Sequence, residues 1–448
     1  MEATSLKRVA FYTLGCKTNQ YDSEAMKERF LERGYRVVDF REDSDVYVVN
    51  TCTVTNLGER KSRQMIHRAH RRNPDAVIAV VGCYAQQAAE EVLAIPGVRV
   101  ALGTNSRNCI VDCVERSQAI KAPVSCVENI REAREFEDMP IHAFAGKTRA
   151  ALKIQEGCSQ FCTYCIIPYV RGPIRSRNPE SIRKEAERLS EAGFREIVLT
   201  GIHIASYGRD RQNTGGTDLL ALLKDLHTIR GIERIRLGSL EPTLLTDKFV
   251  NEARDLPKIC RHYHISLQSG CDATLKRMNR RYTTAEYREI VRRLRCAIPE
   301  VAVTTDIMVG FPGETEEEFA ATCAFAESME FSKIHVFPYS PREGTPAASF
   351  EHQVPPEVRE CRSRKMVALS RKLEQNYMEQ FIGRRGIVLF EKAYNGKEGL
   401  MEGHTDHYIK ALVPGGPELE GKLLPVLFGG REKDCLTGHV TGTDARQP

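Results

Sequence analysis

The sequence has no tryptophan, no long apolar run and no strong excess of charge of one sign. Its 65 lysines and arginines face 60 acidic residues, and a formal net charge of +5 permits an anionic partner without requiring one. No stretch approaches the roughly 18 uninterrupted apolar residues of a membrane helix, and Met1–Leu6 does not begin like a secretory signal. We therefore expect a cytoplasmic protein without a membrane partner.

Cysteine is too sparse for a fold built on disulfides. The chain has 15 cysteines among 448 residues, well below the roughly 8–10% of small disulfide scaffolds, and an odd number would leave one unpaired. In a reducing compartment such cysteines serve as metal ligands, reactive thiols or small core residues. Apolar residues make up 41% of the chain, which is ordinary globular usage.

Apolar runs alternate with amphipathic stretches over most of the chain and predict an α/β fold in three parts. In residues 6–120 the alternation predicts a parallel sheet with helices on its faces. Residues 121–146 have weak periodicity and suit a linker. In residues 147–382 six longer strand–helix units predict a barrel or an open part-barrel. Residues 383–445 are rich in glycine, with short β-prone runs that predict a small all-β barrel.

The expected elements follow from the same periodicities. The strands expected in the first part are Arg8–Leu14, Asp45–Asn50, Ala76–Val81 and Val98–Leu102, and the helices are Asp22–Arg33, Asn56–Arg72 and Gln86–Leu93. The strands expected in the central part are Ala150–Gln155, Glu196–Thr200, Arg234–Leu237, Tyr263–Leu267, Val301–Ile307 and Lys333–Phe337. Those expected in the last part are Ile387–Phe390, His407–Leu412, Leu423–Phe428 and Leu436–Val440.

Three cysteines stand close together just after the first expected strand of the central part. Cys158, Cys162 and Cys165, in GCSQFCTYC, follow the apolar run ALKIQ and lie on a loop. Three neighbouring thiolates can surround one soft metal centre, and thiolates suit iron–sulfur clusters, zinc or cuprous copper. A four-iron cluster normally takes four thiolates, so three leave one iron open to a substrate. A zinc site would need a fourth ligand, and the next His or Cys downstream is His203.

Three further cysteines each follow a strand of the first part. Cys16, Cys52 and Cys83 end the runs FYTLGC, VYVVNTC and AVVGC. Because the carboxyl ends of parallel strands lie at one edge of a sheet, we expect these thiols to meet in one crevice. They predict a second three-thiolate iron–sulfur cluster with an open iron. The alternative interpretation is that cysteine is common at buried strand ends.

The central cysteine triplet resembles that of the radical S-adenosylmethionine (SAM) superfamily. The resemblance implies a part-barrel of six strand–helix units, in which the open iron binds SAM and a 5′-deoxyadenosyl radical is released. The protein then supplies positioning and excludes water. Tyr164, just before the third cysteine, matches an aromatic residue found in many members.

Three later segments resemble the SAM-binding strand ends of this superfamily. DIMVGFPGE (Asp306–Glu314) resembles the pattern G-x-I-x-G-x-x-G-E at Gly310, Gly313 and Glu314, whereas its first and third residues depart from it. The alternative is that this turn only connects a strand to a helix. Further candidates for SAM binding are Ser239 and Glu241, in RLGSLEP, and Gln268, in HISLQSG.

The N-terminal cysteines lie in segments similar to the three signatures of methylthiotransferases: LGCKTNQYDSE (Leu14–Glu24), NTCTVT (Asn50–Thr55) and GCYAQ (Gly82–Gln86). This resemblance covers nearly the whole chain. It implies two 4Fe–4S clusters, one SAM as methyl donor and another as radical source, and a C-terminal RNA-binding barrel of the TRAM type. A methylthio group is then inserted at an unactivated C–H bond. The C2–H of adenine has neither an acidic proton nor a leaving group, so a radical route suits it.

RGPIRSR (Arg171–Arg177) and LTGIHIASYG (Leu199–Gly208) resemble the branch acting on N6-threonylcarbamoyladenosine (t6A) at position 37 of tRNA. The resemblance implies 2-methylthio-t6A as product. Arg171, Arg175 and Arg177 are candidate contacts to the threonyl carboxylate or a phosphate, because arginine binds such groups bidentately; they could equally be solvated. His203 is a candidate cavity residue.

Three alternatives stay open for the function. The target of the methylthio transfer could be isopentenyladenosine at position 37 of tRNA or a ribosomal-protein aspartate. A third alternative is an iron–sulfur RNA-binding sensor without catalysis. An enzyme of this family needs an electron donor such as flavodoxin or ferredoxin, and its sulfur donor is not predicted.

Clusters of basic residues give separate support for a tRNA partner. Arg60–Arg72 holds six lysines and arginines, and Lys276–Arg295 holds eight, with Tyr282 and Tyr287 interleaved as candidate stacking residues. The alternative is a solvated face. Gly383–Pro448 has nine basic and nine acidic residues, so shape or loop contacts are expected there. Cys109 and Cys113, one helical turn apart, are interpreted as packing residues, and His404 and His407 as surface loop residues.

Overall fold

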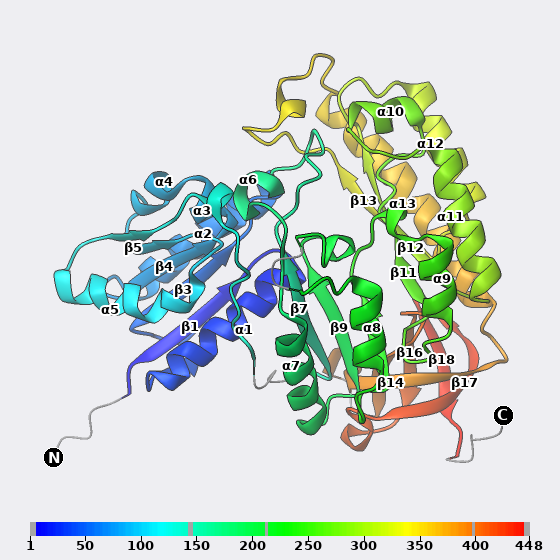
Figure 1. The fold of residues 1–448 in the computed structure, drawn as a ribbon, viewed down its shortest axis with the longest axis horizontal. Helices are drawn as coiled ribbons and strands as arrows, with labels where there is room; N and C mark the ends of the chain where they lie inside the picture. Colours follow the sequence, from blue (N-terminus) through cyan, green and yellow to red (C-terminus); the bar gives the residue numbers. More distant parts are fainter. Residues whose placement is uncertain (1–5, 142–146, 211–213, 397–398, 443–448) are drawn as a thin grey trace.

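The computed structural model describes residues 6–141, 147–210, 214–396 and 399–442. These residues form three units in chain order, which run from blue through green and yellow to red in Figure 1. The expectations for residues 1–5 (no secretory signal), 142–146 (end of the linker) and 443–445 (end of the barrel) lie outside the described residues.

The first unit is a six-stranded parallel sheet in the order β2-β1-β3-β4-β5-β6. The strands are β1 (Arg8–Thr13), β2 (Arg36–Val38), β3 (Val46–Thr51), β4 (Val77–Gly82), β5 (Val98–Leu102) and β6 (Val124–Cys126). The helices are α1 (Lys17–Glu32), α2 (Asn56–Arg72), α3 (Cys83–Gln87), α4 (Ala89–Leu93) and α5 (Ile110–Ile120), with a 3-10 turn η1 (Arg107–Cys109). Both faces of the central strands are buried, which is why their sequences are runs of valine.

Several details of this unit differ from the expectations. The sheet extends past the boundary expected at residue 120, because β6 lies in the expected linker and pairs with β5. Strands β2 and β6 were not expected, since three residues are too short to establish a period. The helix expected over Gln86–Leu93 is two short helices, α3 and α4. Helix α1 begins at Lys17, five residues before the expected start.

The second unit is a part-barrel whose strands run in the order β8-β7-β9-β10 and β11-β12-β13. The strands are β7 (Arg149–Glu156), β8 (Arg175–Ser176), β9 (Glu196–Gly201), β10 (Arg234–Leu237), β11 (His262–His264), β12 (Ala302–Val309) and β13 (Lys333–Pro338). Isolated bridges between Leu240 and Ile265 and between Ile235 and Ile259 connect the two sheets. All six expected strands are present, and β8 is an additional short antiparallel strand.

Helices cover the outside of the part-barrel (Figure 1). They are α7 (Pro179–Glu191), α8 (Leu219–His227), α9 (Asp247–Arg254), α10 (Asp272–Arg277), α11 (Thr284–Ala297), α12 (Glu316–Ser328) and the long α13 (Pro356–Glu379). The short helix α6 (Ile167–Arg171) lies instead against α3 of the first unit. Apolar residues of these helices and strands form the largest core. Local signals set several helix starts: Thr283 and Thr315 each form a capping box, with α11 and α12 respectively.

The third unit is a closed barrel in the order β14-β15-β16-β18-β17. Its strands are β14 (Arg385–Ala393), β15 (Leu400–Thr405), β16 (Lys410–Pro414), β17 (Leu423–Glu432) and β18 (Cys435–Val440). All neighbours are antiparallel except β16 and β18. The expected all-β barrel is confirmed, although β15 was not expected. In the described part of the chain, no helix is both long enough and apolar enough to span a membrane.

Arginines of the part-barrel hold the small barrel in place. Arg234 donates to the Ile387 carbonyl at 2.7 Å, and Arg236 donates to the Asp406 carbonyl at 2.9 Å. The Asp406 carboxylate pairs with Arg261 at 2.7 Å. The small barrel therefore docks where the strands of the part-barrel begin, below the green and yellow unit in Figure 1.

Candidate active site

Cys158, Cys162 and Cys165, here called the central trio, lie on the loop that leaves the carboxyl end of β7. Two backbone hydrogen bonds fold this loop: the Cys158 amide donates to the Gly172 carbonyl, and the Cys165 amide donates to the Cys162 carbonyl, both at 3.0 Å. Burial raises the pKa of Cys158 to about 11 and that of Cys165 to about 12, and the neighbouring Cys162 thiol adds to both shifts. The three thiols are thus close enough to act on one another.

Cys16, Cys52 and Cys83, the N-terminal trio, lie beyond the carboxyl ends of β1, β3 and β4. The loops fit closely because Gly15 has no side chain: with φ at 99°, a Cβ atom there would lie 3.0 Å from Cys52 Cβ. Burial raises the pKa of Cys83 to about 11, with Arg171 opposing this shift and the thiols of Cys52 and Cys16 adding to it. The structure thus brings these cysteines together at one sheet edge, as the strand pattern predicts.

Arg171 connects the two trios. It ends α6, the helix that follows the central trio, and its side chain is buried. Its Nε donates to Cys83 Sγ at 3.2 Å, and its Nη2 donates to the side chain of Asn19. Ile166 and Val170 pack with Cys83 in one apolar cluster. The helix after one trio therefore places a cation against a sulfur of the other trio.

Arg171 also belongs to a buried network of charges between the first two units. Its Nη1 lies 3.2 Å from Asp22 and 3.1 Å from Glu156. Lys153 pairs with Asp22 at 2.7 Å, and Arg107 with Glu156 at 3.4 Å. Burial opposes ionisation of the two carboxyls, but the three cations outweigh it and lower the pKa of both Asp22 and Glu156. The network therefore stays ionised at neutral pH and fixes the first two units, which carry the two trios, relative to each other.

The structure gives the three arginines of RGPIRSR a different role from the one expected. All of them are buried, and none lines the main cavity. Arg177 pairs with Glu185 at 2.5 Å and with Asp138 at 2.7 Å. Arg175 donates to the carbonyls of Arg171 and Pro173, both at 3.1 Å. Contacts within the protein thus replace the expected contact with a threonyl carboxylate or a phosphate.

A second arginine contacts the central trio. Arg280 donates to Cys162 Sγ at 3.3 Å and to both carboxylate oxygens of Glu241 at 2.9 Å. His203 Nε2 lies 3.6 Å from Glu241. Burial opposes ionisation of Glu241, but His203 and Arg280 lower its pKa overall. Each trio therefore has one arginine N–H directed at one of its sulfurs, and a carboxylate, Glu241, lies beside the central one.

The glycine-rich turn after β12 lies next to the same loop. Glu314 accepts hydrogen bonds from the Gly310 amide at 2.6 Å and from Arg362 at 2.8 Å, so its carboxylate holds the turn closed. Tyr164 packs edge-on against Phe311, with ring centroids 6.4 Å apart. The loop that carries the central trio therefore contacts this turn through Tyr164.

Two other predicted residues lie on neighbouring strands. Gln268, which has a φ of 70°, exchanges backbone hydrogen bonds with β12. Ser239 follows β10 and lines the main cavity. The candidate SAM-binding residues thus occur at successive strand ends.

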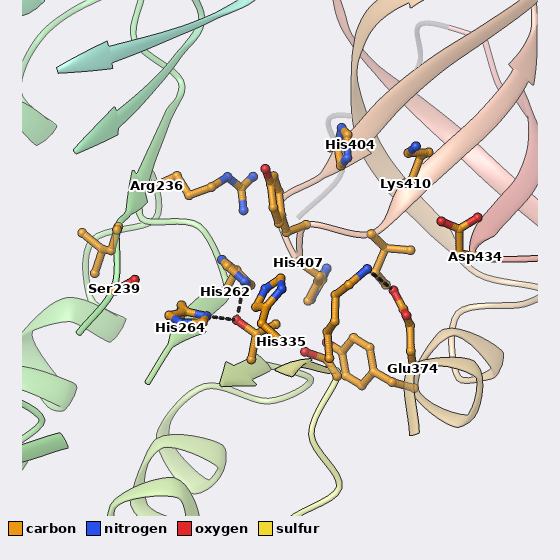
Figure 2. Close-up of a pocket in the computed structure, with 18 of the residues that line it drawn as sticks. Arg236, Ser239, His262, His264, His335, Glu374, His404, His407, Lys410 and Asp434 are labelled. Atoms are coloured by element: carbon orange, nitrogen blue, oxygen red, sulfur yellow. Dashed lines mark hydrogen bonds and ion pairs between the residues drawn. The ribbon is translucent and has the colours of Figure 1, made fainter. Parts of the chain in front are cut away.

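A cavity of about 470 Å³ lies between the part-barrel and the small barrel, and both line it (Figure 2). Polar side chains dominate its lining, which includes Lys17, Arg236, Ser239, His262, His264, Asp306, His335, His404, His407, Tyr408 and Lys410. His264 and His262 share Thr304 as hydrogen-bond partner, at 2.9 and 3.1 Å. The size falls within the range of small-ligand sites. His404 and His407 were expected on the surface, and this expectation is wrong, because the small barrel closes one end of the cavity with them.

Lys17 is the residue after Cys16 and stands at the edge of this cavity. Its ammonium group lies 5.9 Å from the centre of the Tyr408 ring, which also contacts Arg149 and Arg236. Within the described residues, Arg149 pairs with Glu391 and Arg236 with Glu196, whereas Lys17 makes no ion pair. The cavity therefore offers an unneutralised cation one residue from the N-terminal trio.

Two family models match the chain. Residues 8–103 match Uncharacterized protein family UPF0004, and residues 152–326 match the Radical SAM superfamily. Among curated proteins, the chain is 45% identical over 421 residues to a threonylcarbamoyladenosine tRNA methylthiotransferase of Bacillus subtilis, with 93% of each chain covered. It is 34% identical to a tRNA-2-methylthio-N(6)-dimethylallyladenosine synthase of Pelotomaculum thermopropionicum, covering 97% and 98% of the two chains.

The chain belongs to the radical SAM methylthiotransferases. A third relative from another branch, the ribosomal protein uS12 methylthiotransferase of Desulfitobacterium hafniense, is 37% identical over 86% of this chain and 87% of its own. Among solved structures, the radical SAM methyltransferase TsrM of Kitasatospora setae matches with a TM-score of 0.57 at 14% identity, over 77% of each chain. This last similarity concerns the fold alone.

Radical SAM methylthiotransferases use SAM and two 4Fe–4S clusters, and the donor sets of this chain fit them. Each trio offers three soft thiolate ligands, which leaves one iron of a four-iron cluster open. Arg171 and Arg280 each donate to a trio sulfur, and such hydrogen bonds tune cluster potentials. The structure thus supplies two three-cysteine sites that Arg171 and the apolar residues around it connect.

Sequence reasoning missed Lys17, Arg280 and the histidines of the cavity. The expectation that Tyr282 and Tyr287 stack on bases is wrong: both rings are buried, and their hydroxyls donate to the carbonyls of Leu267 and Ile265 at 2.7 and 2.8 Å. On α11 the helical spacing of Tyr287, Val291 and Leu294 was the available signal for burial of Tyr287, whereas Tyr282 precedes the helix. No local signal marked Arg280, whose partner Glu241 lies 39 residues away.

Proposed function

We propose that this methylthiotransferase acts on t6A at position 37 of tRNA and produces 2-methylthio-t6A. The observation that carries the proposal is the cavity beside the N-terminal trio, in which Lys17 forms no ion pair among the described residues. A threonyl carboxylate would neutralise this cation through a charge-assisted hydrogen bond. An isopentenyl group is apolar and would gain nothing from Lys17 or from the histidines. The relative of highest identity above is itself named for threonylcarbamoyladenosine.

The predicted cluster ligands and SAM-binding residues have roles in this proposal. The central trio holds the cluster that binds SAM, and the N-terminal trio holds the auxiliary cluster. When bound, the clusters and SAM supply the radical and the sulfur that polar side chains cannot. Tyr164, Ser239, Glu241, Gln268, Gly310, Gly313 and Glu314 surround the SAM site. Arg280 and His203 orient the Glu241 carboxylate toward it.

Binding of tRNA rests on surface residues as well as on the cavity. The basic residues Arg60, Lys61 and Arg68 on α2 are exposed, as phosphate contacts require. The small barrel, of the TRAM type, closes the cavity with Tyr408 and His404. We place it against the anticodon loop, with the modified base reaching into the cavity.

The partners of this reaction follow from its chemistry. Reductive cleavage of SAM needs a low-potential electron donor such as flavodoxin or ferredoxin. Because tRNA and such donors are cytoplasmic, we place the enzyme in the cytoplasm.

The proposal is tested with the reconstituted enzyme, SAM, a reductant and three substrates in parallel. These are a tRNA carrying t6A, a tRNA carrying isopentenyladenosine and the ribosomal protein uS12. We expect a methylthio product, detected by mass spectrometry, from the t6A tRNA only. A product from uS12 alone would favour the ribosomal-protein branch. Cluster-dependent tRNA binding without 5′-deoxyadenosine would favour a sensor.

A further inference from the structure

A third group of cysteines, distinct from both trios, lies at the far edge of the first sheet. Cys109 ends η1, Cys113 lies in the first turn of α5, and Cys126 ends β6. Their three sulfurs all lie within 4.8 Å of one another, and those of Cys109 and Cys113 are 3.7 Å apart. Cys126 is 13 residues from Cys113 in the sequence, so the pairing of β6 with β5 completes the group.

This spacing suits a single ion. Zinc binds thiolates at about 2.3 Å in a tetrahedron, which places neighbouring sulfurs about 3.8 Å apart. The group contains only thiols, and soft thiolates select zinc among the common divalent ions. Cys113 is buried, while Cys109 and Cys126 are partly exposed, so an ion could enter from solvent.

The location suggests what an ion would do there. Strand β6 pairs with β5 through three residues only, from Val124 to Cys126, and a strand this short at a sheet edge is weakly held. An ion between Cys126 and the two cysteines of η1 and α5 would hold the edge strand in place. It would also fix η1, whose Arg107 contacts Asp22 and Glu156 in the buried charge network.

We propose that Cys109, Cys113 and Cys126 bind one structural Zn²⁺ ion that pins β6 to η1 and α5, with water as the fourth ligand. The site is separate from the two cluster sites. Most zinc sites that stabilise a fold have four protein ligands, so this site would have the coordination by three protein ligands and one water that is otherwise typical of catalytic zinc.

The test uses the full-length enzyme, purified anaerobically with both clusters and incubated with Zn²⁺ before desalting. We expect about one zinc per chain in addition to the cluster iron, and a zinc K-edge absorption spectrum with three sulfur neighbours at about 2.3 Å. The variant Cys126→Ser should lose this zinc and keep its iron. The matched control Cys361→Ser, which changes an exposed cysteine on α13, should keep both.

Two kinds of result would overturn the proposal. Zinc that persists in Cys126→Ser, or that falls as the iron content rises, would be metal held at an incompletely loaded cluster site. A zinc-free enzyme in which mass spectrometry finds Cys109 and Cys113 linked or freely alkylated would mean a redox pair or simple packing. A second variant, Cys109→His, keeps a zinc ligand at that position. It should retain zinc with one nitrogen neighbour, and this distinguishes loss of a ligand from misfolding.

Discussion

Arg171 Nε lies 3.2 Å from Cys83 Sγ, so a residue that follows the central cysteines donates directly to a cysteine of the other trio. The contact crosses 88 residues of sequence and joins two domains. It links the central trio, where SAM is expected to bind, to the N-terminal trio, where the auxiliary cluster is expected. The same guanidinium pairs with Asp22 and Glu156, so the contact with Cys83 belongs to a buried network of charges.

Replacing Arg171 should impair methylthio transfer more than it impairs the cleavage of SAM. In Arg171→Lys the charge stays, but one side chain can no longer reach Cys83, Asn19 and the carboxylates together. Partners that hydrogen-bond to metal ligands are typically worth 10–100-fold, so we expect methylthio product to fall by about that factor. Formation of 5′-deoxyadenosine should fall much less. The exposed Arg230→Lys serves as control, and equal loss of both products in Arg171→Lys would contradict this coupling role.

Replacing either trio should lower the iron content by the same amount but should abolish a different step of the reaction. Two four-iron clusters correspond to about eight irons per chain, and replacing either trio by alanine should leave about four. Without Cys158, Cys162 and Cys165, reductive cleavage of SAM should disappear. Without Cys16, Cys52 and Cys83, SAM cleavage should persist while methylthio transfer is lost. Retention of SAM cleavage in the first triple variant would reject the assignment of the central trio.

Lys17 should determine the preference for a carboxylate in the substrate. Lys17→Gln removes a charge-assisted contact worth about 1.5–3 kcal/mol, so kcat/KM for t6A tRNA should fall by roughly 10–100-fold. A tRNA carrying the methyl ester of t6A lacks the anion, and the wild-type preference for acid over ester should shrink in Lys17→Gln. Lys17→Arg should largely restore it. An unchanged acid-to-ester ratio in Lys17→Gln would mean that another group reads the carboxylate.

Asp22 should matter for stability with a defined pH dependence. It is buried and pairs with Arg107, Lys153 and Arg171. Removing one partner of a buried ion pair lowers the free energy of unfolding by about 3–5 kcal/mol. Because the folded pKa of Asp22 lies below its unfolded value of about 3.9, its contribution is present above that pH and is lost only as the pH falls through the folded pKa.

Urea unfolding of the full chain checks this expectation. Asp22→Asn should lower the free energy of unfolding equally at pH 8, 7 and 6. A difference between Asp22→Asn and wild type that disappears between pH 8 and 6 would contradict the ionised network. Asp43→Asn, which changes an exposed carboxylate on the same domain, is the control.

The sequence predicted the two cysteine trios well, because these predictions needed only local spacing and the positions of strand ends. Cys16, Cys52 and Cys83 are far apart in the chain, yet the parallel order of β1, β3 and β4 predicts that they meet. The triplet of Cys158, Cys162 and Cys165 was local and needed no topology. These two features identified the family before any side-chain geometry was known.

The sequence failed where burial depends on distant partners. Arg171 and Arg177 look like free cations in RGPIRSR, but Asp22 and Glu185, which bury them, lie on other elements. The cavity could not be predicted at all, because three separate domains supply Lys17, His264 and Tyr408. Cys126 likewise joined Cys109 only through a three-residue strand that shows no period.

The central claim, that this enzyme methylthiolates t6A, is tested most directly by nucleoside mass spectrometry of total tRNA from a deletion strain. We predict that 2-methylthio-t6A disappears, that t6A accumulates by the same amount, and that the wild-type gene restores the product while a Cys158→Ala copy does not. Undiminished 2-methylthio-t6A in the deletion strain would contradict the account.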